Sequence, residues 1–244
     1  MNTDSIFLRA LPKIDKSWKG FLTPQNLRLL QSIENSVARE GNDFTPPPDR
    51  VLHFLTLPLD RVKVIILGQD PYPQKGVATG RAFEVGTLNS WHDTYNNISL
   101  KNIIRSIYSA YHNQYLRYNE VKEKMDHSFP ILSPDKLFKH WEKQGVLLLN
   151  TSFTCKTGKP SSHQKIWDPF TQKLLRYIHQ KNNGIIWFIW GNHARNITAG
   201  LAINHKIESM HPMMCYDKPG RDTDFLFGKV NAFTETKEII NWLG

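Results

Sequence analysis

The chain has 244 residues, of which 40% are hydrophobic and 11% aromatic, and this composition supports a folded core and excludes a disordered chain. Lys and Arg outnumber Asp and Glu by 31 to 22, and the net charge of +9 favours nucleic acid as a partner, although many soluble proteins are basic without a specific reason. No apolar stretch approaches the roughly 20 residues that a membrane span needs, and two cysteines without a CxxC pair predict neither a disulfide framework nor a zinc site.

The sequence contains no repeat and no flexible linker, so we expect a single domain over residues 1–244. Its first 20 residues lack the long apolar segment of a signal peptide. We therefore expect a cytoplasmic location, or a nuclear one if the host is eukaryotic.

The first half of the chain contains two helical patterns and one strand pattern. Thr23 and Pro24 predict the N-cap and first turn of a helix that continues through Val37. Aliphatic residues at 62–67 predict a buried strand, and apolar residues at helical spacing predict a second helix over 103–111. For 113–140, which is rich in charged residues, we expect a surface helix or loop.

Three further strands are expected, at 145–150, 184–190 and 206–210, the last with the weakest pattern. Asp168 and Pro169 repeat the cap-and-proline signal ahead of a helix, and 233–243 predicts a closing helix. Strands that alternate with helices indicate an α/β fold: a central four-stranded, mostly parallel sheet flanked by helices on both faces.

Each expected strand ends in, or is followed by, polar side chains. They are Gln69 and Asp70, Asn150, Asn192 and His193, and His211. A single one would be explained by a helix cap or a turn, but ligands of open parallel sheets bind beyond the carboxyl ends of the strands, so four together favour a site. The sequence lacks GxSxG, HExxH and a complete phosphate loop, which favours metal-free and cofactor-free chemistry on a planar, polar ligand.

Several long segments, read in chain order, resemble the family 1 uracil-DNA glycosylases. GQDPYPQKGVATGRAF at 68–83 is similar to the family's water-activating motif without a gap, and GVLLLNT at 145–151 is similar to its uracil-reading strand. SSHQKIWDPFT at 161–171 and IIWFIWGNHA at 185–194 resemble the segments that follow, and HP at 211–212 resembles the start of the DNA-intercalation loop. The resemblance runs from PPPDRVLHFL to residue 233.

The resemblance implies excision of uracil from DNA by hydrolysis of the N-glycosidic bond after base flipping, without a metal or cofactor. Asp70 would orient water and stabilise positive charge on the deoxyribose, and His211 would donate a hydrogen bond to the uracil oxygen that becomes anionic. The uracil-binding residues would be Gln69, Tyr72, Phe83 and Asn150. The DNA-binding residues would be Ser99, His163, Asn192, Pro212, Met213, Met214 and Cys215.

Selectivity for uracil places physical demands on two of these residues. A missing methyl group is worth only about 1–3 kcal/mol in a pocket that merely fills space, so rejecting thymine needs a rigid wall, and Tyr72 stands between two prolines. Cytosine presents the reverse donor and acceptor order, so Asn150 discriminates only if its amide cannot flip. We therefore expect a hydrogen bond that holds the Asn150 amide.

The departures from the family pattern lie in the segments that would hold DNA. Pro73 replaces a second histidine, and HPMMCYDKPGRDTDF follows where the family has HPSPLS with a leucine wedge, an apolar side chain that enters the base stack. Met213, Met214 or Tyr216 could serve as the wedge. Equally, the loop could dock on DNA differently, bind a protein partner, or be a surface loop without a role.

Three hypotheses remain open from the sequence. The first is an active uracil-DNA glycosylase that acts as a monomer on single- or double-stranded DNA, with a protein inhibitor as a possible second partner and no membrane association. The second is a DNA-binding relative whose glycosylase activity is weak or lost because the loop at 211–224 is altered. The third, a small-molecule binding protein, explains the strand ends but neither the ordered motifs nor the charge.

Overall fold

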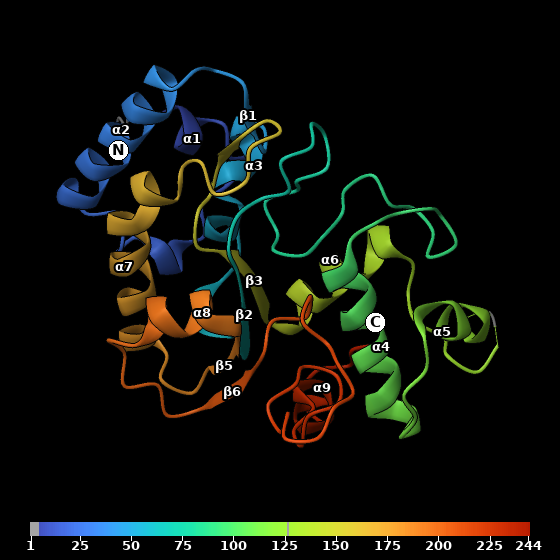
Figure 1. Ribbon diagram of the computed structural model, residues 1–244. Helices are drawn as coiled ribbons and strands as arrows, with labels where there is room; N and C mark the ends of the chain where they lie inside the picture. The colour runs from blue at the N-terminus through green and yellow to red at the C-terminus, as the bar shows by residue number, and fades with distance from the viewer. Residues whose placement is uncertain (1–4, 126) are drawn as a thin grey trace.

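The computed structural model describes residues 5–125 and 127–244, so residues 1–4 and 126 of the expected domain lie outside the described residues. Its centre is a four-stranded sheet in which every neighbouring pair of strands is parallel and the strand order is β3-β2-β5-β6. The strands are β2 (Val64–Gly68), β3 (Val146–Asn150), β5 (Ile186–Trp190) and β6 (Lys206–Ser209). Helices cover both faces of the sheet (Figure 1), which confirms the predicted α/β architecture.

Side chains of the strands alternate between two apolar cores, one on each face of the sheet. In β2, Ile65 and Leu67 face the first core, whereas Val64 and Ile66 face the second. All residues of β2 and β3 are buried, so their sequences are nearly unbroken apolar runs instead of alternating patterns.

Each core is covered by its own set of helices. The first core packs against α1 (Ile6–Arg9), α2 (Pro24–Arg39), α3 (Pro48–Val51), α7 (Gln164–Lys181) and α8 (Gly191–Thr198). The second packs against α4 (Ile98–His112), α5 (Tyr118–Lys124), α6 (Pro134–Gln144) and α9 (Ala232–Thr236). Short 3-10 helices lie at Lys16–Trp18, His53–Thr56 and Leu59–Arg61. A small antiparallel pair, β1 (Phe44–Thr45) and β4 (Cys155–Lys156), was not predicted.

Two of the expected helices are present with their predicted signals. Helix α2 begins at Pro24, and the Thr23 hydroxyl accepts the backbone N–H of Asn26 at 3.3 Å, so the predicted N-cap is confirmed. Helix α4 contains the expected 103–111 stripe but begins earlier, at Ile98. Its first turn lies at the edge of the pocket described below.

The predicted start of the helix at Asp168 and Pro169 is wrong. Helix α7 begins at Gln164, and Pro169 lies inside it. Trp167 is fully buried in the first core and donates its indole N–H to Thr154 Oγ1 at 2.7 Å. This tertiary packing stabilises a helical turn ahead of the proline and overrides the local signal.

The expectations for 113–140 and 233–243 are met only in part. The first segment forms α5 and the start of α6 and exposes many polar residues as expected, but it also contributes Val121, Phe129 and Leu137 to the second core. Helix α9 ends at Thr236, and beyond it the backbone N–H of the fully buried Trp242 donates to the Tyr111 hydroxyl at 3.2 Å. Burial of this indole requires the chain to leave the helix.

No helix within the described ranges combines the length and hydropathy needed to cross a membrane. In the same part of the chain, no group of three or more His, Cys, Asp or Glu side chains is arranged to hold a metal ion.

Candidate functional site

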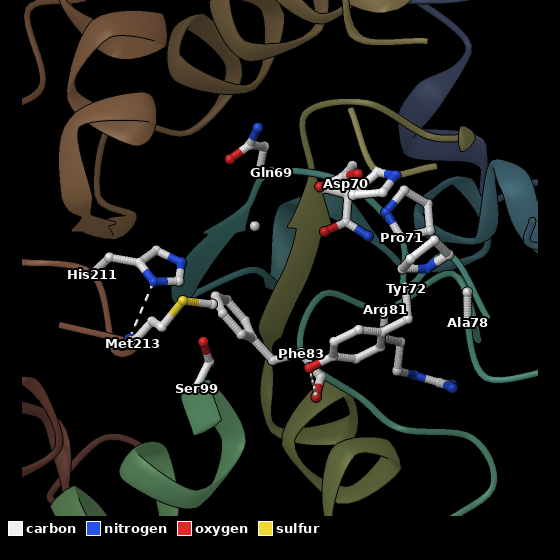
Figure 2. Close-up of a pocket in the computed structure, with 14 residues that line it drawn as sticks. Gln69, Asp70, Pro71, Tyr72, Ala78, Arg81, Phe83, Ser99, His211 and Met213 are labelled. Carbon is white, nitrogen blue, oxygen red and sulfur yellow. Dashed lines mark hydrogen bonds between the residues drawn. The ribbon is translucent and has the colours of Figure 1, made fainter. Parts of the chain in front are cut away.

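A cavity of about 230 Å³ lies beyond the carboxyl ends of β2 and β3. The parallel register pairs Gly68 with Asn150, so both strands end at the same level, and the segments that follow them form the walls. Figure 2 shows His211 and Met213 on one side of the cavity and Pro71 and Tyr72 on the other. Its lining contains eight of the predicted site residues, namely Gln69, Asp70, Tyr72, Phe83, Ser99, Asn150, His211 and Met213.

The Asp70 carboxylate is held by one hydrogen bond. Its Oδ2 accepts the backbone N–H of Ser161 at 2.6 Å, and no other hydrogen bond to this carboxylate is formed within residues 5–125 and 127–244. Burial raises the pKa of Asp70, and the Ser161 amide and His193 only partly offset this effect. The remaining oxygen therefore lies in the cavity lining as a free acceptor for water or a ligand.

The His211 imidazole is held as a neutral hydrogen-bond donor. The backbone N–H of Met213 donates to its Nδ1 at 3.2 Å, so the neutral ring carries its proton on Nε2. Burial lowers the pKa of His211, and the nearby His193 lowers it further. A side chain at Gly191 would contact the His211 Cβ at 2.9 Å, and Gly191 has φ of +83°, so only glycine allows this approach.

The Asn150 amide is held by packing and not by the hydrogen bond that we expected. The residue is 5% exposed, yet no hydrogen bond to its side chain is formed among the described residues. A methyl group at Gly68 would overlap the Asn150 Oδ1, so the amide fills the space that glycine leaves on the neighbouring strand. The expectation of a hydrogen-bonded amide is therefore wrong, and steric confinement takes its place.

Tyr72 and Phe83 form the aromatic part of the lining. The Tyr72 hydroxyl donates to the Phe83 carbonyl at 3.4 Å, and burial raises the pKa of this phenol to about 12, so Tyr72 is neutral. Phe83 adopts a φ of +66°, which is strained for an aromatic residue, and its ring packs against Trp190 with centroids 5.6 Å apart. Strained backbone conformations that are stabilised by packing are typical of functional sites. Here the strained conformation places the Phe83 ring in the lining of the cavity.

The predicted DNA-binding residues fall into two groups. Met213 is 54% exposed and Met214 48% exposed, Asn192 is exposed at the start of α8, and Ser99 lies in the cavity lining at the first turn of α4. For these four residues, a DNA contact stays a prediction.

The other three predicted DNA-binding residues are withdrawn from the surface. His163 is fully buried, with Nδ1 2.9 Å from Thr154 Oγ1, so its predicted DNA contact is wrong in this structure. Pro212 is also buried, and its carbonyl accepts hydrogen bonds from Asn102 and from the half-buried Cys215. The predicted DNA contacts of the Pro212 ring and the Cys215 thiol therefore find no support in the geometry.

Two residues of the site were missed by the sequence reasoning. Ser161 positions Asp70 through its amide and accepts the Gln69 amide N–H on its hydroxyl at 2.9 Å. Arg81 lies in the cavity lining and forms ion pairs with Glu142 at 2.7 Å and Glu84 at 3.0 Å. Ser161 has φ of +58°, and no local sequence signal indicates that such a turn would bring its amide to Asp70.

These features define an α/β protein with a site for a flat, polar ring beyond the carboxyl ends of its parallel strands. Comparison with known proteins makes this class specific. Residues 56–235 match the model of the uracil DNA glycosylase superfamily, and the chain belongs to this family.

Relatives and solved structures agree with this assignment. Uracil-DNA glycosylase 1 of Listeria monocytogenes serotype 4b is 30% identical over 237 residues, covering 93% of this chain and 97% of the relative. Uracil-DNA glycosylase of Borrelia duttonii is 33% identical over 190 residues, 75% of each chain. The wild-type UNG structure of Nitratifractor salsuginis aligns with a TM-score of 0.67 and 27% identity over 85% of this chain and 87% of that chain. A mimivirus uracil-DNA glycosylase variant, solved in complex with UGI, shares the fold at a TM-score of 0.69 and 22% identity, over 95% of this chain and 86% of that chain.

Proposed function

We propose that this protein excises uracil from DNA by hydrolysing the N-glycosidic bond of a flipped-out deoxyuridine. The observation that carries the proposal is the convergence of Asp70, Asn150 and His211 with Tyr72 and Phe83 around one cavity. These groups come from segments far apart in the chain, and together they offer a carboxylate, an amide, an N–H donor and two aromatic rings. The family assignment and the uracil-DNA glycosylases among the relatives support the same reaction.

The proposed chemistry uses charges that are in place before the substrate binds. As the glycosidic bond breaks, negative charge develops on the uracil and positive charge on the deoxyribose. The Nε2–H of neutral His211 donates to the uracil oxygen, and the Asp70 carboxylate stabilises the sugar cation and orients the attacking water. Groups that need no rearrangement during the reaction stabilise the transition state most effectively.

The same cavity accounts for base selection. The Phe83 ring stacks on the pyrimidine, and the confined Asn150 amide reads its hydrogen-bonding edge. The Tyr72 ring, tied to the Phe83 carbonyl, occupies the space that a thymine methyl group would need. A rigid wall rejects thymine more strongly than the absence of a contact could.

For the wedge, we propose the exposed methionines of the altered loop. Met213 and Met214 are both about half exposed, and Met213 lines the cavity, whereas the thiol of Cys215, which replaces the family's leucine, lies 3.2 Å from the Pro212 carbonyl. A flexible apolar side chain can enter a base stack and help to offset the few kcal/mol that base flipping costs.

The test is uracil release from single- and double-stranded oligonucleotides, followed by alkaline cleavage of abasic sites. We expect cleavage of both substrates and none of matched thymine or cytosine oligonucleotides. Measurable DNA binding without any cleavage would contradict the proposal and favour the hypothesis of an inactive DNA-binding relative. Cleavage of single strands alone would retain the chemistry but contradict the proposed wedge.

A protein inhibitor is the second partner that we propose. The mimivirus variant of similar fold was solved with UGI, and the exposed Met213, which lines the cavity, and the neighbouring exposed Met214 offer an apolar surface for such a protein. Adding UGI at a molar excess should suppress uracil release. Unchanged uracil release, together with no complex in size-exclusion chromatography, would contradict the proposal that UGI binds this protein.

A further inference from the structure

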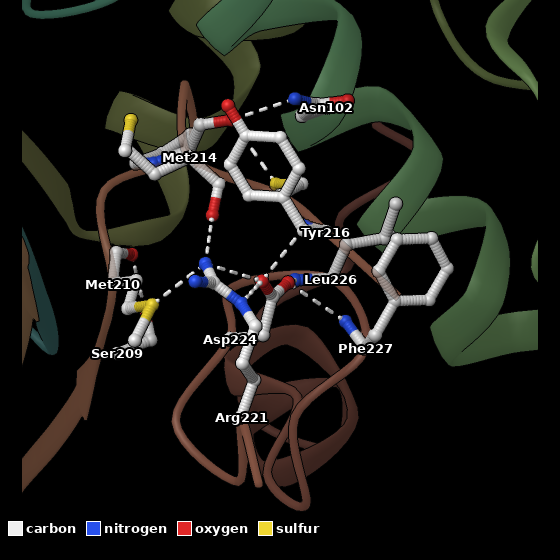
Figure 3. Close-up of polar contacts among 11 residues, drawn as sticks. Asn102, Ser209, Met210, Met214, Tyr216, Arg221, Asp224, Leu226 and Phe227 are labelled. Atoms are coloured by element: carbon white, nitrogen blue, oxygen red, sulfur yellow. Dashed lines mark hydrogen bonds and ion pairs between the residues drawn. The ribbon is translucent and has the colours of Figure 1, made fainter. Parts of the chain in front are cut away.

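The 211–224 loop has no regular secondary structure, but an ion pair between the partly exposed Arg221 and a buried carboxylate closes its base. Asp224 is fully buried, and its Oδ2 accepts Nε and Nη2 of Arg221 at 3.1 and 3.0 Å. The carboxylate also accepts the backbone N–H groups of Tyr216, Leu226 and Phe227 at 2.9 to 3.1 Å. Figure 3 shows these contacts converging on Asp224, so the carboxylate is the centre of the loop.

Arg221 extends from this centre to the first turn of the loop. Its Nη2 donates to the Met214 carbonyl at 2.9 Å and contacts the Met210 sulfur at 2.9 Å. The guanidinium carbon lies 5.0 Å from the centre of the Tyr216 ring, within range of a cation–π contact. The Arg221 side chain therefore links Met210, directly before the loop, with Met214 near its start and Asp224 at its end.

The turn that Arg221 contacts through the Met214 carbonyl is also the turn that holds His211. The Met214 N–H donates to the His211 carbonyl at 2.8 Å, and the Met213 N–H donates to His211 Nδ1 at 3.2 Å. The Pro212 carbonyl of this turn also accepts hydrogen bonds from Asn102 and Cys215, and Arg221 adds the contact to the Met214 carbonyl. The chain of contacts runs from Asp224 through Arg221 and Met214 to His211.

We propose that Arg221 is a positioning residue for His211: by holding the Met214 carbonyl, it keeps the Met213 N–H on Nδ1 and so keeps the proton of His211 on Nε2, facing the substrate. The inference rests on the role of His211 in the proposed function. It assigns to the altered part of the loop a catalytic purpose in addition to DNA contact.

The direct test is the titration of His211 followed by ¹⁵N NMR in the wild type and in Arg221→Met, with the signal assigned through His211→Gln. An N–H donated to Nδ1 disfavours the imidazolium, so its loss should move the titration of His211 to higher pH and mix the two neutral tautomers. The ionisable groups around the ring, His193 and Asp70, are unchanged in this variant. An unchanged titration and a single Nε2–H tautomer would overturn the proposal. This readout needs no catalysis, so failure of the proposed function is detected separately, as a wild type that releases no uracil.

Kinetics on single-stranded uracil oligonucleotides provide the second readout, because a single strand needs no wedge. We expect Arg221→Met to lower kcat by about tenfold with little change in KM, since a charge-assisted hydrogen bond that orients a catalytic group is lost. The acid limb of its pH profile should lie at higher pH than that of the wild type. A loss confined to duplex substrates would overturn the proposal and indicate a DNA contact instead.

Two controls separate position from charge and from folding. Lys218→Met removes an exposed charge from the same loop and should leave both readouts unchanged, whereas an equal effect would assign the result to charge alone. Arg221→Lys keeps the charge but lacks the planar fork, so full rescue by lysine would also contradict the proposal. Because Arg221→Met leaves Asp224 buried and unpaired, the double variant Arg221→Met/Asp224→Asn provides a form without that charge and should show the same shift in titration.

Discussion

At the scale of single residues, the ionised Asp70 carboxylate lowers the stability of the folded protein at neutral pH. Burial raises its pKa, and one backbone N–H from Ser161 is its only hydrogen-bond partner in the described part of the chain. A raised pKa means that the folded protein disfavours the ionised form, so the charge that the reaction needs costs folding free energy at neutral pH. Such a carboxylate is ready to interact with a cation that forms beside it.

Asp70→Asn should therefore separate activity from stability. We expect uracil release to fall by about a hundredfold or more, with DNA affinity nearly unchanged. The variant should be at least as stable as the wild type at pH 7, because the disfavoured charge is gone and the amide oxygen can still accept the Ser161 N–H. This difference should vanish as the pH falls below the ordinary aspartate value of 3.8. Thermal unfolding across this range measures it, and a variant that loses DNA affinity as strongly as activity would contradict the division of roles.

Gly68 tests whether packing alone confines the Asn150 amide. Gly68→Ala should displace that amide and lower uracil release, while discrimination against cytosine weakens, because the added methyl group would overlap Oδ1. Gly200→Ala is the matched control, since a side chain there meets no atom within 4 Å. Normal kinetics in Gly68→Ala would show that the amide is held in another way.

The sequence was informative about the site where a residue directly follows a strand. Asp70, Asn150 and His211 could be placed at one edge because parallel strands end together. His163 and Ser161 show the limit of this reasoning, since both lie in the same segment, yet one is buried and the other positions Asp70. Their places depend on tertiary packing around Trp167 and Thr154, which local patterns do not contain.

At the scale of elements, helix α6 supports the cavity from behind. Arg81, in the segment between Tyr72 and Phe83, pairs with Glu142 of α6, and Glu142 also lies 2.9 Å from His53. The side chains of Arg81 and Glu142 are only 12% and 6% exposed. Burial alone would raise the pKa of Glu142, but His53 and Arg81 outweigh it and hold the pKa below its ordinary value.

Glu142→Gln should lower the free energy of unfolding by about 3 kcal/mol at neutral pH, because it leaves Arg81 with an incompletely paired buried charge. A carboxyl group whose pKa is lowered by folding stabilises the folded state at pH values above its pKa in the unfolded chain. This stabilisation is lost as the pH falls through the pKa of the group in the folded state. The difference between wild type and variant should therefore shrink below pH 4.5, the ordinary value. Chemical denaturation at several pH values measures this, with Glu123→Gln, at an exposed position of α5, as the control. A pH-independent difference would contradict the role of the charge.

Prediction of elements from the sequence succeeded where the pattern and the packing agree. The three apolar strands and α2 have local signals that match their tertiary environment. The pattern did not predict the start of α7, the end of α9 or the partial burial of 113–140. In each case the burial of one aromatic side chain, Trp167, Trp242 or Phe129, determines the course of the backbone. Charged residues around such an aromatic side chain conceal its burial.

At the scale of the whole molecule, the net charge of +9 should govern DNA affinity. We expect the Kd for duplex DNA to rise at least about tenfold between about 50 and 200 mM salt, through release of counterions from the phosphates. Affinity for free uracil, which is uncharged, should be insensitive over the same range. Isothermal titration or fluorescence anisotropy measures both affinities. A Kd for duplex DNA that does not change with salt would show that electrostatic attraction is not the basis of DNA binding.

The alternation of β2 between two cores has a consequence for how this chain tolerates insertions and deletions. Losing one residue from this strand would turn Val64 and Ile66 toward the helices that now cover Ile65 and Leu67, and would shorten the path to Asp70 by one step. Folding and catalysis would fail together, because the same count of residues determines both. A change in the length of β2 therefore affects every one of its residues at once, whereas a substitution affects a single position.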